Sequence, residues 1–442
     1  MISLKLKTNV FSIAILAFCG ILLETSMNVT FPTLSKQFDT TIANTQWITT
    51  SYLLAVAVVI ILNSYLLRSF PLKTIVSTAL LLFLFGDICC YLAPNLPTLI
   101  IGRIIQGIST GITLPTMFAI IMINIPQQKQ GTYIGIAGMV AALAPSLGPT
   151  FGGTMTALFT WREIFLLVFP ITLIAGILAI MTTVNLKQRQ RSPFNLFQYL
   201  LLIIIMVSLT LLLNTLSTGL QPVQLLYVVI IAIVSPILYS QLRRSTNPII
   251  NIRIFKQPVF NVTLLIYFLV QFMQMTFTFL LPTLVQNEFR QTTVIAGLIL
   301  LPGSLLSAVL QPLTGKMLDR LGITCPYKIG AACLLLATGL FVIWHNSIFL
   351  LVLWFLLYMT GFSFVFNNSL TVGVQQLNHA LITDGNATFN MLQQYSGSLA
   401  TACISSIIAF IPGLRGYMTS FILIFIVCLL TVWKMRSLKS TL

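Results

Sequence analysis

Charged residues are scarce in this sequence. They make up 7% of its 442 residues, whereas apolar residues make up 57%. A soluble domain is about one quarter charged, so this chain has too little charge to cover a surface that faces water. The shortage is typical of a protein whose surface faces the hydrocarbon of a lipid bilayer.

Metal-binding and catalytic patterns are also missing. The chain has 2 His and 7 Cys, and the cysteines form no CxxC pair. His345 and His379 fall in predicted loops and lack the spacing of metal ligands. Because there is no HExxH pattern, no phosphate-binding loop and no cluster of His and Asp, we expect neither a metal nor a cofactor. These absences argue against a membrane-embedded enzyme and against ATP as the energy source.

The charges that are present are strongly unbalanced. Lys and Arg number 23 against 7 Asp and Glu, which gives a formal net charge of +16. Nucleic-acid-binding proteins show a similar excess, but here the basic residues lie in short loops between apolar segments, without a basic face or a recognition motif. We therefore expect no nucleic-acid partner and assign the excess to the positive-inside bias of membrane proteins.

Long apolar segments occupy most of the chain. A membrane-spanning helix needs about 20 mostly apolar residues. The first such segment has no small-residue cleavage site, so we interpret it as a retained helix and not as a signal peptide. The predicted fold class is an all-α polytopic membrane protein with 14 transmembrane helices, at roughly 10–31, 47–67, 75–92, 98–123, 132–157, 164–184, 194–213, 222–242, 261–285, 295–314, 326–343, 348–375, 385–411 and 416–434.

The basic residues also predict the orientation in the membrane. If the N-terminus lies in the cytoplasm, most of them fall on the cytoplasmic side, and an even number of helices returns the C-terminus to that side. The exceptions are Lys36, Arg162, Arg290 and Arg415 on the outer side and Arg103 inside a predicted helix. We predict a multi-pass protein of the plasma membrane with both termini in the cytoplasm.

Two predicted helices, at about 194–242, contain no charged residue. They separate two six-helix stretches, and each stretch has a short basic loop after its second helix. This weak internal symmetry is of the kind that parallel repeats of membrane proteins show. We predict an N-terminal six-helix bundle (1–190), two linker helices (191–245) and a C-terminal six-helix bundle (246–442).

The most distinctive motif lies in the fifth predicted helix. It reads Ala144-Pro-Ser-Leu-Gly148-Pro149-Thr-Phe-Gly152-Gly153. Glycines four residues apart allow a neighbouring backbone to approach closely, and each proline removes a backbone hydrogen bond and bends the helix. We expect a bent, small-faced helix that acts as a hinge between two packed halves, with ordinary tight packing as the alternative.

Other motifs match one known family at corresponding places. Arg103-Ile-Ile-Gln106-Gly107, followed by Pro115, is similar to RxxQGxGxxxxxP, and Leu23-Glu24-Thr25 to Pro32 is similar to LDxTIVNVALP. The helix-five motif is similar to GxxxGPxxGG, with Ala144 in place of the first glycine. Segments at 161–165, 247–255 and 301–303 match as well. Over essentially the whole chain, the sequence resembles the fourteen-helix drug:proton antiporters of the EmrB/QacA type in the major facilitator superfamily.

This resemblance implies a secondary active exporter of the bacterial plasma membrane, which exchanges drugs for ions by alternating access. It also implies two conformational motifs. The first comprises Gly148, Pro149, Gly152 and Gly153, and the second comprises Gly315, Asp319 and Arg320. In the family, the aspartate of the second motif caps a neighbouring helix and latches the two halves. The corresponding N-terminal loop departs from the pattern, because it keeps only Arg68 and Lys73.

Two of the seven acids, Glu24 and Asp87, lie inside predicted helices. A charged side chain in mid-membrane costs at least a few kcal/mol and is a functional candidate by default. At a rise of 1.5 Å per residue, both acids and Arg103 lie about 8–10 Å below the outer surface. We predict a buried ion pair between Asp87 and Arg103, and we expect Glu24 to carry the proton. Alternatively, both acids hold Na⁺ in one cavity, or Arg103 is a switch that competes for Glu24.

The substrate site is expected to be apolar and adaptable, because thioether, aromatic and amide groups occur together in the ninth predicted helix. The candidate substrate-binding residues are Asn28, Gln271, Phe272, Met275, Asn367 and Gln394. Helix packing or a lipid-facing side is the alternative interpretation. We expect small amphipathic, cationic drugs as substrates, H⁺ or Na⁺ as the coupling ion, and a monomer in the lipid bilayer. An exporter or flippase for a native lipid or metabolite is the alternative function of the same fold.

Overall fold

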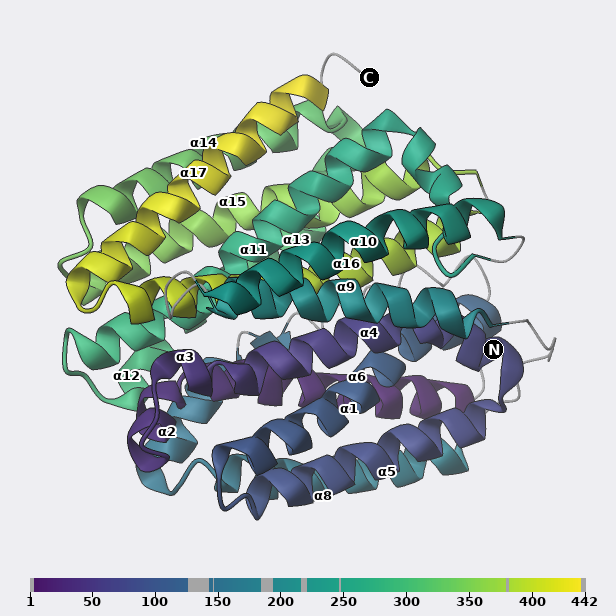
Figure 1. The fold of residues 1–442 in the computed structure, drawn as a ribbon, viewed down its shortest axis with the longest axis horizontal. Helices are drawn as coiled ribbons and strands as arrows, with labels where there is room; N and C mark the ends of the chain where they lie inside the picture. Colours follow the sequence, from purple (N-terminus) through teal and green to yellow (C-terminus); the bar gives the residue numbers. More distant parts are fainter. Residues whose placement is uncertain are drawn as a thin grey trace. The chain divides into compact units, whose positions relative to one another are not determined.

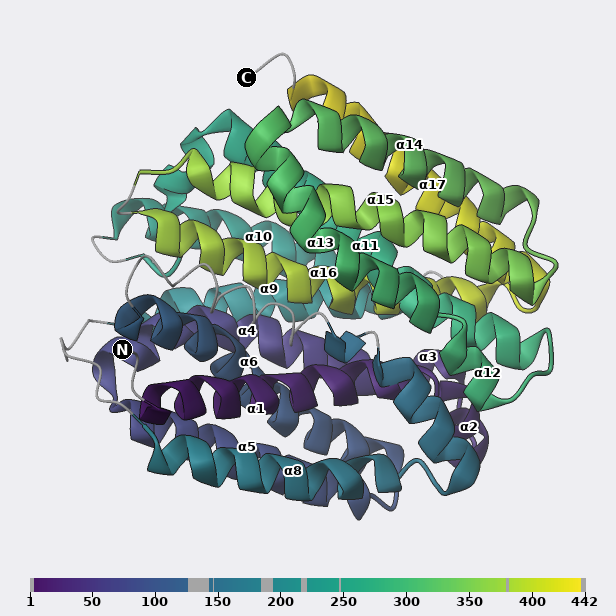
Figure 2. The same cartoon turned by 180° about the vertical axis from the view of Figure 1, so that it is seen from behind.

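The computed structural model describes residues 4–125, 143–145, 147–183, 194–215, 221–245, 248–378 and 381–438. Within these ranges the regular structure is helical and contains no strand. The chain divides into two compact units, each of which combines segments from different parts of the sequence. Figures 1 and 2 show the helices of these units from opposite sides.

Unit 1 comprises Met1–Thr40, Trp47–Pro193 and Thr292–Leu298. In this unit α6 packs on α1, α4 and α5, and α8 packs on α1 and α5. Residues 147–158 are also helical. The labelled helices are α1 (Leu4–Asn28), α2 (Phe31–Gln37), α4 (Trp47–Ser69), α5 (Leu72–Tyr91), α6 (Leu96–Asn124), α8 (Glu163–Met181) and α12 (Thr293–Leu298).

Unit 2 comprises Thr41–Gln46, Phe194–Gln291 and Ile299–Leu442. In this unit α11 packs on α15, α16 and α17, and α9 packs on α10 and α16. Its helices are α3 (Ile42–Thr45), α9 (Leu196–Thr215), α10 (Pro222–Arg244), the 3₁₀-helix η2 (Ile252–Lys256), α11 (Pro258–Asn287), α13 (Leu301–Leu321), α14 (Thr324–Ile343), α15 (Ile348–Gln375), α16 (Ile382–Phe410) and α17 (Leu414–Leu438).

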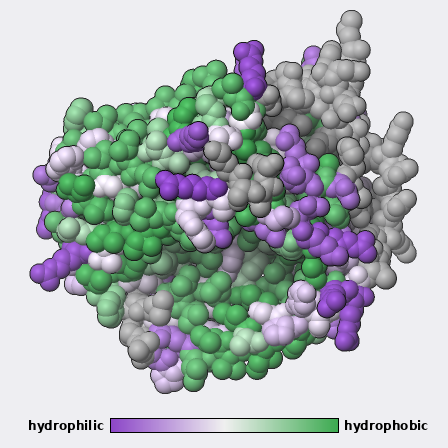
Figure 3. Space-filling model, turned by 90° about the horizontal axis from the view of Figure 1, so that it is seen from above, coloured by the Kyte–Doolittle hydropathy of each residue, from purple (hydrophilic) through white to green (hydrophobic). Residues whose placement is uncertain are grey.

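Twelve helical segments among the described residues are long and apolar enough to cross a membrane. Large apolar side chains on these segments are exposed, including Ile174 (61%), Leu225 (67%) and Val309 (67%). Figure 3 shows hydrophobic residues over most of one face of the molecule. An exposed apolar surface on this scale is stable in lipid and not in water. The predicted all-helical, multi-pass membrane fold is therefore confirmed.

The count of fourteen transmembrane helices and the division into two bundles and a linker stay predictions. The fifth predicted helix, at 132–157, is described only in part. The helix α16 is 29 residues long, but it is not among the twelve segments that meet the apolar criterion.

Proline, asparagine and glycine begin or end several helices. Pro222 and Pro258 are the first residues of α10 and α11, a position where the missing N–H has no helical partner to lose. The Asn95 side chain accepts a hydrogen bond from Thr98 N at 3.0 Å and caps α6. Gly322 follows α13 with φ of 67°, a left-handed conformation that favours glycine.

One predicted transmembrane segment, 295–314, is divided into two helices. The helix α12 ends at Leu298, and α13 begins at Leu301. Pro302 explains the break, because it has no N–H to donate to the Leu298 carbonyl four residues earlier. Two short helices, α2 and α3, also occur where a loop is predicted between the first two transmembrane segments.

Candidate functional site

Glu24 lies in α1 and is almost fully buried, with 2% of its surface exposed. In the part of the chain that the structure describes, no hydrogen bond reaches its carboxyl group. The carboxyl group interacts electrostatically with the guanidinium of Arg103 in α6. A buried carboxylate is costly to keep charged, so Glu24 gains by binding a proton or a cation.

A hydrogen-bonded chain of three side chains joins α5 to α6. Gln106 donates through Nε2 to Oδ1 of Asp87, and its Oε1 accepts from Nη1 of Arg103 at 2.7 Å. None of the three side chains is more than 1% exposed. The contact predicted between Asp87 and Arg103 thus runs through the amide of Gln106 and not through a direct ion pair. Arg103 and Gln106 reach each other because residues three apart share one face of a helix.

Two atoms at the ends of this chain lack hydrogen bonds among the described residues. They are Oδ2 of Asp87 and Nη2 of Arg103, and both are buried. A buried polar atom without a partner costs about 1–3 kcal/mol, and more when it is charged. Asp87 Oδ2 is therefore a place where a proton, a cation or water would gain by binding, and Arg103 Nη2, which can only donate, is a place where water or another acceptor would gain.

Tyr52 of α4 holds Arg103 in place and ties it to α1. The Arg103 guanidinium lies over the Tyr52 ring, 4.2 Å from its centroid. The Tyr52 hydroxyl lies 2.8 Å from the Gly20 carbonyl oxygen and 2.8 Å from Thr110 Oγ1. Because Gly20 is one helical turn before Glu24, Tyr52 positions the cation beside the part of α1 that carries the acid.

Replacing Gln106 by leucine should destabilise the protein strongly. The substitution leaves Asp87 Oδ1 and Arg103 Nη1 buried without their partner, at a cost of about 1–3 kcal/mol for each group. The midpoint of thermal unfolding in detergent measures this loss. Gln291→Leu is the matched control, because Gln291 is exposed, and it should shift the midpoint little. Equal shifts for both variants would contradict the bridging role of Gln106.

The glycines of the helix-five motif pack against α1. A Cβ on Gly152 would lie 2.3 Å from the Ser26 carbonyl oxygen, and a Cβ on Gly148 would lie 1.9 Å from Thr25 Oγ1. Ser26 Oγ also donates to the Gly148 carbonyl at 2.9 Å. The predicted close approach is present at both glycines, whereas their role as a hinge stays a prediction.

The same motif contacts α12, a partner that the sequence does not reveal. The Gly153 carbonyl accepts a hydrogen bond from Thr293 Oγ1 at 3.0 Å. A Cβ on Gly297 would lie 2.2 Å from the Pro149 carbonyl oxygen. Gly148 and Gly152 therefore face α1, and Pro149 and Gly153 face α12, so this helix contacts a neighbour on each of two sides.

The second conformational motif is described in part. A Cβ on Gly315 would meet nothing within 4 Å among the described residues, and Arg320 is exposed near the end of α13. The side chains of Asp319 and Arg68 lie outside the described part of the chain. The predicted latch formed by Asp319 therefore stays a prediction.

The predicted substrate-binding residues fall in both units. Asn28 of unit 1 accepts a hydrogen bond from Thr49 Oγ1 at 2.9 Å, and its Nδ2 is buried without a partner among the described residues. The other five belong to unit 2, and no hydrogen bond between described residues joins any two of them. Gln271, Met275 and Gln394 are buried, Phe272 is partly exposed, and Asn367 donates to Gln311 Oε1 at 3.0 Å.

Unit 2 contains an aromatic stack that the candidate residues from the sequence do not include. The Tyr267 ring stacks on Phe366 with centroids 4.1 Å apart, and Phe366 stacks on Phe362 at 4.6 Å. The Tyr267 hydroxyl donates to Gln393 Oε1 at 2.7 Å. The spacing of Phe362 and Phe366, four residues apart on α15, is the signal that predicts their contact.

One segment of α6 has the GxSxG spacing of serine hydrolases, Gly107-Ile-Ser109-Thr-Gly111. In hydrolases the serine stands on a sharp turn between a strand and a helix, whereas here it lies in the middle of a helix. Its hydroxyl donates to the Ala79 carbonyl at 2.6 Å, and a Cβ on Gly107 would lie 2.6 Å from the Tyr52 carbonyl oxygen. The spacing therefore serves helix packing.

Comparison with known proteins identifies the family. Residues 13–402 match the family model described as Major Facilitator Superfamily. The chain belongs to this superfamily. The family predicted from the motifs is thus confirmed, and the superfamily consists of transporters, so the protein is a transporter and not an enzyme.

Two bacterial relatives of this major facilitator chain bear names that refer to drug resistance. The lincomycin resistance protein LmrB of Bacillus subtilis (strain 168) is 28% identical over 423 residues, which cover 94% of this chain and 88% of LmrB. The putative multidrug resistance protein MdtD of Escherichia coli O17:K52:H18 (strain UMN026) is 26% identical over 384 residues, which cover 85% of this chain and 80% of MdtD.

Solved structures support the fold of the superfamily. The crystal structure of a POT family transporter in complex with a thioalcohol-conjugated peptide has a TM-score of 0.74 to this chain. The match covers 97% of this chain and 96% of that one, at 13% sequence identity. At this identity the likeness concerns the fold alone.

Proposed function

We propose that this major facilitator protein is a secondary active exporter that exchanges amphipathic, cationic drugs for H⁺. The names of the relatives LmrB and MdtD support drug export. The observation that carries the coupling proposal is Glu24, which is buried in α1, lacks a hydrogen bond among the described residues and interacts with Arg103. We further propose fourteen transmembrane helices in two six-helix bundles and a linker, cytoplasmic termini, and a monomer.

The proposed exchange follows from the cost of a charged carboxylate at the buried Glu24. A proton neutralises the carboxylate, and a cationic drug offsets its charge, so the two bind in competition. Entry of a proton from outside displaces the drug outward, and release of the proton to the cytoplasm makes Glu24 available for the next drug. The glycines at 148, 152 and 153 provide the small-faced helix that we propose as the hinge for alternating access.

The second buried acid sets the alternatives for the coupling ion. Asp87 Oδ2 has no hydrogen bond among the described residues, so Asp87 has a free oxygen for a second proton. Carboxylate oxygens from Glu24 and Asp87 would also suit Na⁺. Export of a native lipid or metabolite is the second candidate function. At 28% and 26% identity to the drug-resistance relatives, the substrate can differ from theirs.

Reconstituted protein tests the proposed function. The purified protein is placed in liposomes, proton and sodium gradients are imposed separately, and the uptake of ethidium is followed by fluorescence. We expect uptake against its concentration gradient when the proton gradient is present, and none without a gradient. Transport that is indifferent to both gradients would contradict coupled export, and transport driven by sodium alone would assign the site to Na⁺.

If Asp87 carries a second proton beside Glu24, the wild type should respond to membrane potential, and Asp87→Asn should lose that response and keep a response to the pH gradient. Exchange of two protons for one monovalent drug moves one net charge, and one charge across 100 mV is worth about 2.3 kcal/mol, or about 50-fold in the drug ratio. Exchange of one proton for one such drug gains nothing from the potential. The measurement is the steady-state drug ratio at zero and at 100 mV. An undiminished response to potential in the variant would exclude Asp87 as the second carrier.

A further inference from the structure

Two of the described residues other than glycine have a left-handed backbone, Asp39 with φ of 46° and Arg290 with φ of 55°. The Cβ of such a residue crowds the following carbonyl oxygen, which lowers the population of this conformation about 5- to 30-fold. Both side chains are exposed, and neither forms a hydrogen bond or an ion pair within the described part of the chain. Their own side-chain contacts therefore do not offset the strain.

Both residues close the C-terminal end of a helix. Asp39 follows α2, and Arg290 follows α11. The amide after each residue donates back to a carbonyl of the helix, at 2.9 Å after Asp39 and at 3.1 Å after Arg290. Glycine usually fills the left-handed position of such a helix end. The chain uses glycine at the two other left-handed positions that the structure describes, Gly322 and Gly413.

The two strained residues stand at corresponding places in the chain. Asp39 lies between the first two helices of the predicted N-terminal bundle, and Arg290 lies between the first two of the predicted C-terminal bundle. The chain passes from unit 1 to unit 2 after Thr40, and from unit 2 to unit 1 after Gln291. Each strained residue is thus one residue away from the point where the chain leaves its unit. The two left-handed glycines both lie within unit 2, away from such a passage.

The segment after Asp39 forms α3, which packs on α16 of unit 2. Ala43 and Thr45 of this single turn are buried. The Thr41 side chain caps it by accepting a hydrogen bond from Asn44 N at 3.2 Å. Packing therefore holds α3 in unit 2, although α2 before it and α4 after it belong to unit 1.

The segment after the second strained residue forms α12, which packs on the helix-five motif of unit 1. Thr293 Oγ1 donates to the Gly153 carbonyl at 3.0 Å, and Thr150 Oγ1 donates to the Gly297 carbonyl at 3.5 Å. Ala296 is fully buried. These contacts hold α12 in unit 1, although α11 before it and α13 after it belong to unit 2.

We propose that Asp39 and Arg290 are strained hinges that favour the release of α3 from α16 and of α12 from the helix-five motif. Both residues are left-handed while the segments after them are docked. Release allows each residue to return to an ordinary φ, so the strain shifts the balance between docked and released segments toward release. In the proposed exporter, release accompanies alternating access, and this consequence rests on the proposed function.

Hydrogen exchange of the full-length protein in detergent, followed by mass spectrometry, tests the hinges. Amides of a docked segment exchange when the segment is released, so their rate follows the released population. Arg290→Gly should slow exchange at 293–298 about fivefold, and Asp39→Gly should do the same at 42–46, because glycine adopts a left-handed φ without crowding. The low end of the range applies because glycine also gives the released state more freedom.

Alanine at the same positions gives the matched control. Arg290→Ala and Asp39→Ala remove the same side chains but keep the Cβ, so exchange should not slow. Equal slowing by glycine and alanine would overturn the proposal in favour of a charge effect. Exchange that is unchanged or faster in both glycine variants would overturn it as well. If Arg290→Gly does not fold, Arg290→Asn should slow exchange in the same direction, because asparagine tolerates a left-handed φ better than arginine does.

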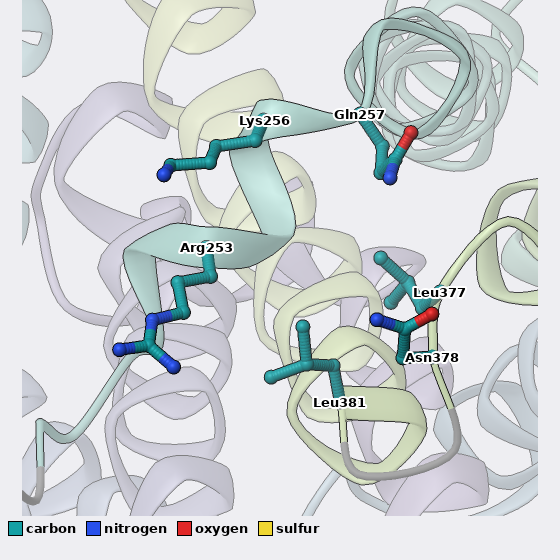
Figure 4. Close-up of a pocket in the computed structure, with 6 residues that line it drawn as sticks. All are labelled: Arg253, Lys256, Gln257, Leu377, Asn378 and Leu381. Atoms are coloured by element: carbon teal, nitrogen blue, oxygen red, sulfur yellow. The ribbon is translucent and has the colours of Figure 1, made fainter.

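The helix η2 gives an internal reference in the same experiment. It precedes α11, at the end opposite to the hinge at Arg290. Figure 4 shows η2 across from Leu377 and Leu381, with the charged ends of Arg253 and Lys256 pointing away from these leucines. Because η2 adjoins neither hinge, its exchange should be the same in all variants. Slowing of η2 by the same factor would show a general stabilisation and overturn the local hinges.

Ethidium transport in liposomes tests the consequence for transport. The D39G/R290G variant should lower the initial rate about fivefold or more, and D39A/R290A, which keeps the strain, should transport as the wild type does. Slower exchange with an undiminished transport rate would overturn the role of release in transport. A wild type that does not transport ethidium would contradict the proposed function alone, because hydrogen exchange still decides whether the hinges exist.

Discussion

Glu24→Gln should abolish the accumulation of drug that a proton gradient drives. If one proton exchanges for one drug molecule, a difference of two pH units supports a drug ratio of up to about 100-fold across the membrane, at tenfold for each 1.4 kcal/mol. Glutamine has nearly the same shape as glutamate, but its side-chain amide does not bind and release a proton in the pH range of the experiment. The variant should therefore bring the drug ratio to about 1, measured in liposomes at steady state.

The control for Glu24→Gln is Glu288→Gln. Glu288 is exposed at the end of α11, so its neutralisation should leave the drug ratio unchanged. Equal amounts of folded protein in the liposomes, measured by size-exclusion chromatography after extraction, separate lost coupling from lost protein. Full accumulation by the Glu24→Gln variant would remove Glu24 as the carrier and leave Asp87 as the candidate.

Gly152→Ala should destabilise the protein and stop transport, although it adds a single methyl group. The new Cβ would lie 2.3 Å from the backbone oxygen of Ser26 in α1, and backbone atoms cannot rotate away as a side chain can. The two helices must separate, and overpacking of this kind costs about 1–3 kcal/mol. The midpoint of thermal unfolding in detergent and the initial rate of ethidium uptake measure the two effects.

Gly339→Ala is the matched control for Gly152→Ala. Gly339 lies in α14, and a Cβ there would lie 3.6 Å from Phe425, an ordinary contact distance. This variant should unfold and transport as the wild type does. A Gly152→Ala protein that is as stable as the Gly339→Ala protein would show that α1 and the helix-five motif do not pack as the structure has them.

The sequence predicts the positions of residues along the membrane better than their partners. Hydropathy and the scarcity of charge place Glu24, Asp87 and Arg103 inside helices, and all three are buried in the structure. Glycine spacing predicts close packing at Gly148 and Gly152, and in the structure a Cβ on either residue would collide with α1. Hydropathy and glycine spacing are both properties of a short stretch of residues, so they can be determined from one sequence.

The contact partners of a buried side chain depend on the rotation of its helix about its own axis and on which helix packs against it. A single sequence does not contain this information. Gln106 bridges Asp87 and Arg103 because all three side chains turn toward the same place between α5 and α6. Likewise, α12 meets Gly153 although the two segments are far apart in the sequence. The break between α12 and α13 was readable from Pro302 but was hidden by the continuous apolar segment around it.

Drug-induced proton release tests the central claim, that drug and proton compete for Glu24, most directly. The purified protein is placed in a weakly buffered, sodium-free detergent solution that contains a pH indicator, and ethidium is added. We predict the release of about one proton for each drug bound by the wild type and none by the Glu24→Gln variant. Drug binding without proton release from the wild type, or equal release from the variant, would contradict the account.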